Sequence, residues 1–211
     1  MSRINIFTNF TITLLNNYIR VLITGIGCLL FTCMLLNTGW ADAQPYDTLQ
    51  WRSIRVLSWA DFRGRADKFS DDDALTKSSI VVSFEFVRPG HINYEIRAVF
   101  HYYGSWVKDY AKTDRLLLHE QNHFNITELF ARKIRKELSE TEYVPGKFKS
   151  TLDSIYTKYE REWKSYQFIY DKQTNHGINH NAQKEWSEKV AEELKRYESY
   201  INPNIRIPIV R

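Results

Sequence analysis

Residues 116–126 read LLLHEQNHFNI, a run of apolar side chains that contains two histidines four positions apart. Side chains four residues apart on an α-helix project from the same face, one turn above the other. His119 and His123 could therefore bind one metal ion, with Glu120 on the adjacent face. This His-Glu-x-x-His spacing is typical of helices that bind zinc and use the glutamate as a general base. The alternative is a packed helix with two buried histidines and no metal.

The apolar pattern continues beyond the motif and predicts a helix from about Lys112 to Ser139. The predicted buried stripe contains Leu116, His119, His123, Ile126, Phe130, Ile134 and Leu138. Both histidines lie in this stripe, where an unpaired polar group is costly, and metal ligation would satisfy them. The opposite side is expected to face solvent and contains Gln121, Asn125, Glu128, Arg132 and Arg135. Glu128 would point away from the metal.

A third ligand has to come from elsewhere in the chain. The metzincin extension is absent, because Ile126 and Leu129 stand where that pattern has glycine and histidine. A second helix is predicted from about Lys147 to Thr174, and a glycine that stops helices follows at position 177. His176, just before this glycine, is the expected third ligand.

Other residues near the end of the second predicted helix offer further candidates. Asp171 and His180 are the alternatives to His176 as a metal ligand. Tyr170 is a candidate donor to the oxyanion of a hydrolytic reaction, with a core tyrosine as the alternative. A third helix is predicted from Ala182 to Ile201, and the tail from Pro203 to Arg211 is expected to be irregular and to lie along the surface or an edge.

The part of the chain before the first helix has the pattern of β-structure. Residues 80–87 are β-branched and aromatic, a Pro-Gly turn follows, and residues 92–100 alternate apolar and polar side chains. A hairpin around residues 76–104 is therefore predicted. Residues 49–52 and 54–57 suggest an edge strand or two. The expected fold class is α+β, with a small antiparallel sheet packed on a three-helix, zincin-like core.

The N-terminal segment has the features of a signal peptide. Residues 21–36 are almost wholly apolar, and the small-x-small sequence Ala41-Asp42-Ala43 follows. Residues 1–43 are thus predicted to be a signal peptide, with an uncleaved membrane anchor as the alternative, and residues 44–211 a single zinc peptidase-like domain. Both cysteines lie within this segment, so the exported part would contain no disulfide. The net charge of +4 is small and unclustered, which gives no case for nucleic-acid binding.

Four blocks of the sequence together resemble a family of predicted secreted zinc-dependent proteases of bacteria, catalogued mainly as a bacterial domain of unknown function. The blocks are Trp59-Ala-Asp-Phe-Arg-Gly64, His119–Ile126, Ala131-Arg132 and Tyr170–Gly177. The resemblance covers roughly residues 48–198, and the pairing of the helix motif with the Thr174-x-His-Gly177 block is its most specific sign. It implies a zinc peptidase-like domain with His119 and His123 as ligands and Glu120 as the catalytic residue.

The expected function is that of a secreted or envelope zinc metallopeptidase. A peptide bond would be hydrolysed by a zinc-activated water, with Glu120 as general base. The expected cofactor is Zn²⁺, and the expected partner is a peptide or protein substrate. The alternatives are an envelope protein with a structural zinc site and a membrane-tethered binding module. Substrate specificity and oligomeric state are left open by the sequence.

Overall fold

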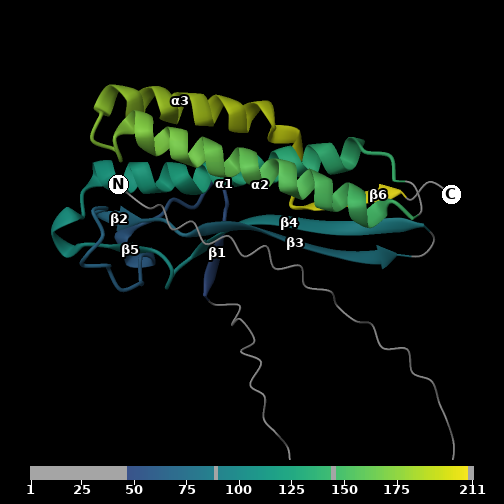
Figure 1. Ribbon diagram of the computed structural model, residues 1–211, viewed down its shortest axis with the longest axis horizontal. Helices are drawn as coiled ribbons and strands as arrows, with labels where there is room; N and C mark the ends of the chain where they lie inside the picture. The colour runs from purple at the N-terminus through teal and green to yellow at the C-terminus, as the bar shows by residue number, and fades with distance from the viewer. Residues whose placement is uncertain (1–46, 88–89, 144–145, 209–211) are drawn as a thin grey trace, which may run out of the picture.

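Three long helices cover one face of a small antiparallel sheet in the computed structural model, which describes residues 47–87, 90–143 and 146–208 (Figure 1). This mixed α+β architecture confirms the fold class expected from the sequence. The predicted signal peptide or anchor, residues 1–43, lies outside the described residues. Within the described part, every helix is too short or too polar to cross a bilayer.

The helices begin and end close to their predicted bounds. They are α1 (Asp114–Glu140), α2 (Phe148–Thr174) and α3 (His180–Arg196). The side chain of Thr113 caps α1 by accepting a hydrogen bond from the amide of Leu116. Three short 3₁₀ helices accompany them, Trp59–Asp61, Asp109–Ala111 and Glu198–Tyr200 (η1, η2 and η3).

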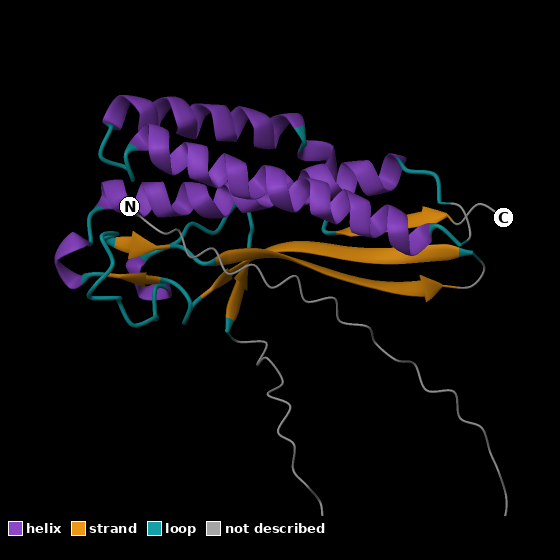
Figure 2. Cartoon of the chain, in the orientation of Figure 1, coloured by secondary structure: helices purple, strands orange, loops and turns teal. Residues whose placement is uncertain are grey.

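The predicted hairpin forms the centre of the main sheet. Strand β3 (Ser78–Val87) pairs antiparallel with β4 (His91–His101), with Ser78 opposite Phe100. The other edge of β4 pairs with β1 (Thr48–Gln50) and with β6 (Asn204–Pro208). A second, two-stranded sheet joins β2 (Ala74–Leu75) to β5 (Trp106–Val107). Figure 2 shows the strands gathered on one side of the helices.

Two sequence expectations for the ends of the domain were correct only in part. The tail lies along an edge, but it is not irregular over residues 204–208, because β6 pairs with β4 and buries Ile207. Of the edge strand or two expected over residues 49–57, one forms, as β1. Residues 54–57 form no strand; an isolated bridge joins Arg52 to Arg55, and the side chain of Ile54 is 91% exposed.

The core lies between the sheet and α1. Every second side chain of β4 from Ile92 onward faces the helices and is buried. Phe124 of α1 packs against Phe100 of β4, whereas Phe130 packs against Tyr159 and Tyr166 of α2. The α1 members of the core are Phe124, Ile126, Phe130, Ala131, Ile134 and Leu138. Helices α2 and α3 cover the other side of α1, which is therefore enclosed on nearly all sides (Figure 1).

This enclosure overturns the expectation of a solvated polar side on α1. Gln121, Glu128, Arg132 and Arg135 are all buried, and Glu128 receives hydrogen bonds from both arginines at 2.9–3.2 Å. Arg135 also donates to the carbonyl oxygens of Ile96 in β4 and Tyr200 in η3. The polar residues of α1 thus bond α1 to β4 and the C-terminal segment. As predicted, Glu128 is directed away from the two histidines.

Candidate metal centre

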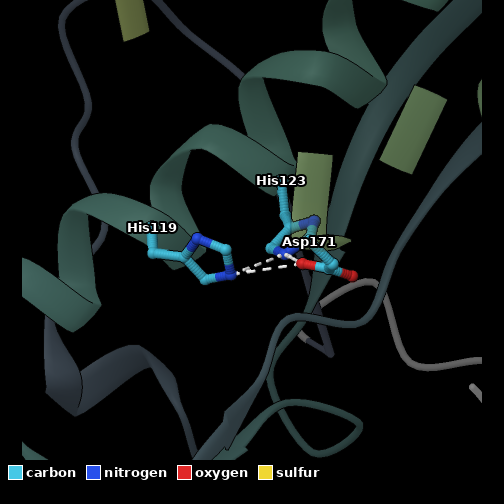
Figure 3. Close-up of side chains that lie close together, drawn as sticks. All are labelled: His119, His123 and Asp171. Carbon is cyan, nitrogen blue, oxygen red and sulfur yellow. Dashed lines mark hydrogen bonds and ion pairs between the residues drawn. The ribbon is translucent and has the colours of Figure 1, made fainter. Parts of the chain in front are cut away.

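Helices α1 and α2 bring three potential metal ligands together: His119, His123 and Asp171. The Nε2 atoms of the two histidines lie 3.1 Å apart. The Oδ1 atom of Asp171 lies 3.2 Å from Nε2 of His119 and 2.8 Å from Nε2 of His123 (Figure 3). One ligand atom from each residue therefore faces a common point, and the group could hold a metal ion.

Two buried glutamines contact the other nitrogen of each imidazole. Nδ1 of His119 lies 3.1 Å from Oε1 of Gln183 in α3, and Nδ1 of His123 lies 2.6 Å from Oε1 of Gln167 in α2. An amide oxygen only accepts hydrogen bonds, so each Nδ1 carries a proton in this arrangement. In a neutral imidazole this leaves the lone pair on Nε2, the atom that faces the common point.

The inward-facing atoms are poorly satisfied without a metal. Oδ1 of Asp171 is buried and close to both imidazoles, yet it has no partner with hydrogen-bond geometry among the described residues. Two Nε2 lone pairs and a carboxylate oxygen repel one another unless a positive charge lies between them. A cation at this point would satisfy all three atoms, so the residues fit a metal ion.

In the metal-free protein a proton supplies that charge. Burial disfavours protonation of His123, but the Asp171 carboxylate, followed by Glu120, outweighs burial and raises the pKa of His123 to about 9. Burial likewise opposes ionisation of Asp171, but the imidazoles of His123 and His119 hold the pKa of its carboxyl well below the usual range. The site is built for a positive charge, which a proton or a metal ion can provide.

Glu120 lies one residue from the first ligand and is 3% exposed. Its backbone carbonyl accepts a hydrogen bond from the hydroxyl of Thr76, which precedes β3. Its Oε2 is buried and has no hydrogen-bond partner within the described residues. A buried carboxylate oxygen without a partner is unusual in a folded protein and marks a candidate functional group.

Tyr170 occupies a different place from the one expected of an oxyanion donor. Its ring stacks on His119 at 4.7 Å and meets the edge of His123 at 4.9 Å. Its hydroxyl is turned towards Gln183 Oε1, at 3.0 Å, and towards the carbonyl of His119, at 3.2 Å. Tyr170 is fully buried, its hydroxyl is bonded to these two groups, and its ring packs against both histidines.

His176, the expected third ligand, is not among the three grouped residues. Helix α2 continues to Thr174, which directs Asp171 in its last full turn towards α1. Asn175 and His176 then adopt positive φ, and the half-exposed His176 lies 3.7 Å from Asp72. His180, the other alternative, begins α3 and contacts Arg115 on the surface. The structure therefore groups Asp171, an alternative that the sequence had left open, and not His176 with the two histidines.

The Thr174-x-His-Gly177 block forms the turn after α2, and its glycine packs against His119. Gly177 has a φ of 80°, a left-handed conformation, and a Cβ added there would lie 3.0 Å from Cβ of His119 and 3.4 Å from its Nδ1. The buried hydroxyl of Thr174 donates to the carbonyl of Tyr170, and the amide of Gly177 approaches the same hydroxyl at 3.4 Å. The block closes the end of α2 tightly against the first histidine.

Sequence reasoning did not identify Gln167 and Gln183 as part of the site. Both glutamines are buried polar residues from distant parts of the chain, and each lies on the inward face of its helix. No spacing rule connects a glutamine to a histidine more than forty positions away.

A comparison with protein-family models matches residues 74–177 to a family described as "Bacterial protein of unknown function (DUF922)". The matched segment runs from β2 to just beyond α2 and contains His119, His123, Asp171 and Gly177. The description of this family states no activity. Searches of curated proteins and of solved structures found no match.

Proposed function

We propose that the chain is a zinc metallopeptidase whose metal is held by His119, His123 and Asp171. The convergence of three ligand atoms, with Nδ1 of each imidazole against a glutamine oxygen so that Nε2 is the atom directed to the common point, is the observation that carries this proposal. We also propose that the helical core is zincin-like.

The donor set supports zinc in a catalytic setting. Catalytic zinc sites typically have three protein ligands from His, Asp, Glu or Cys and leave one position open, whereas structural sites have four. Among the described residues the group contains three such side chains. Two imidazoles and one carboxylate are also a donor set of non-haem iron, so the metal has to be identified by elemental analysis.

Glu120 is the proposed general base. When bound, zinc would supply Lewis acidity, which makes water nucleophilic near neutral pH and polarises a carbonyl group. Glu120 would take the proton from that water and pass it to the leaving amine. Its burial next to a ligand and its unpartnered Oε2 support this role, since a structural metal has no need of such a carboxylate.

The test combines metal content with hydrolysis of an unfolded protein substrate such as casein. Glu120→Gln should keep stoichiometric zinc and lower kcat/KM by about 10²-fold or more, the usual contribution of a general base. Glu192→Gln, an exposed change on α3, is the matched control and should behave like the wild type. Wild-type hydrolysis by Glu120→Gln would refute the role of Glu120. Zinc without hydrolysis in the wild type would support the structural-zinc alternative.

The proposed setting is the cell envelope or the exterior of a bacterium, with a peptide or protein as substrate. The support is the signal-like segment before residue 44 and the family of bacterial proteins that the chain matches. Cell fractionation with N-terminal sequencing would test it: a protein beginning at Gln44 supports export, and an intact N-terminus in the membrane fraction supports the tethered alternative.

A further inference from the structure

Different groups hold the two glutamines that contact the histidines. Gln183 faces the hydroxyl of Tyr170, to which its Nε2 donates at 2.8 Å and from which its Oε1 accepts at 3.0 Å. A hydroxyl can donate or accept, so this contact alone would suit either orientation of the Gln183 amide. Nε2 of Gln183 also lies 3.4 Å from Oγ of Ser187, a hydroxyl that donates its own proton to the backbone carbonyl of Gln183.

Gln167 is held by a backbone carbonyl. Its Nε2 lies 3.0 Å from the backbone carbonyl oxygen of His123, an atom that can only accept. A flipped amide would place two acceptor oxygens against each other in a buried site. Nε2 therefore stays on the carbonyl, and Oε1 stays 2.6 Å from Nδ1 of the same histidine.

A third group supports this orientation from outside. The Thr127 hydroxyl, one turn after His123, lies 3.3 Å from Nε2 of Gln167 and donates to the His123 carbonyl at 3.0 Å. It also accepts from Nε1 of Trp163 and lies 2.7 Å from the hydroxyl of Ser78 at the start of β3. Thr127 thus presents an oxygen that acts as an acceptor to Nε2 of Gln167, in the longest of these contacts, and the shorter bond from Nε2 to the His123 carbonyl is the main support of the orientation.

We propose that Gln167 is a positioning residue that holds His123 in the tautomer protonated at Nδ1, with Thr127 fixing the orientation of the Gln167 amide. The inference deepens the proposed function, since this tautomer is the one whose Nε2 can bind the metal.

The direct test is the tautomer of His123 in the metal-free protein. Nitrogen chemical shifts of its imidazole, measured by NMR at alkaline pH where the ring is neutral, distinguish a proton on Nδ1 from one on Nε2. The wild type should show Nδ1–H alone. Gln167→Leu should give a mixture of tautomers, and Gln167→Glu, which keeps an acceptor, should restore Nδ1–H. A mixture in the wild type, or an unchanged tautomer in Gln167→Leu, would overturn the proposal.

A second pair of variants changes Thr127 and leaves Gln167 in place. Thr127→Val keeps the shape but removes the hydroxyl, and Thr127→Ser keeps the hydroxyl. The valine variant should shift the His123 tautomer in the same direction as Gln167→Leu, to a smaller extent, and the serine variant should not. Equal tautomer populations in the two Thr127 variants would show that this hydroxyl does not orient Gln167.

Metal affinity gives a readout on the bound state. Zinc ions alone, titrated against a competing chelator, should bind Gln167→Leu about 10–100-fold more weakly than the wild type, the usual effect of losing an outer partner of a ligand. Unchanged zinc affinity in this variant would count against the positioning role. A wild type that binds no zinc would refute the proposed function, whereas the tautomer measurement would still decide the inference.

Discussion

Gly177 packs directly against His119: a side chain at this glycine would begin 3.0 Å from the Cβ atom of the histidine. The contact joins the turn after α2 to the helix that carries two of the three proposed ligands. Close packing of this kind leaves no room for adjustment, so changes in the turn should be felt at the metal.

Gly177→Ala should therefore reduce both stability and metal binding. The positive φ alone costs about 1–3 kcal/mol in a residue with a side chain. The added methyl group should also displace His119 and weaken zinc binding. Gly146→Ala is the matched control, because Gly146 has a φ of 85° but no atom near its missing Cβ. Chemical denaturation should show a loss in both variants, and zinc titration a loss only in Gly177→Ala. Equal zinc affinity in the two variants would show that the contact between Gly177 and His119 does not affect metal binding.

Tyr170→Phe separates a supporting role from a catalytic one. The change keeps the ring stacked on His119 but removes the hydroxyl that bonds to Gln183. The expected result is a loss of about 1–3 kcal/mol in the free energy of unfolding, since a buried amide loses its partner. The kcat of the variant should stay within a few-fold of the wild type. A fall of about 10²–10³ in kcat with unchanged stability would instead restore the oxyanion role expected from the sequence.

Glu128 is expected to be one of the most important residues for stability. Glu128→Ala would leave the buried Arg132 and Arg135 without their shared carboxylate, which should cost about 3–5 kcal/mol. Asp153→Ala, which breaks an exposed pair with Lys149, should cost less than about 1 kcal/mol. Denaturant unfolding of both variants provides the comparison. Similar losses would mean that the buried network contributes no more than a surface pair.

The spacing of His119 and His123 was sufficient to predict their approach, because four residues on a helix return to the same face. The hairpin and the three helices were predicted from periodicity together with turn and helix-stop residues, which are also local signals. These features depend on local sequence, and the structure reproduces them close to the predicted bounds.

The features that sequence reasoning missed depend on how distant elements meet. Arg132 and Arg135 have the charge and spacing of surface residues, but α1 is enclosed, and besides Glu128 of α1 itself they bond to carbonyl oxygens in other elements. The choice of Asp171 over His176 depends on where α2 ends and on two consecutive residues with positive φ. No sequence pattern indicates Gln167, because its contact with His123 arises only where α2 packs against α1.

The identity of the third ligand is the point on which the proposed metal centre depends most. Asp171→Asn changes the charge of the carboxylate with little change in its size, and His176→Ala removes the residue that the sequence favoured. Zinc content of the two purified proteins, measured by elemental analysis after dialysis, compares them directly. The geometry predicts that His176→Ala keeps the zinc stoichiometry of the wild type and that Asp171→Asn loses most of its zinc. Full zinc in Asp171→Asn, with loss in His176→Ala, would contradict the site.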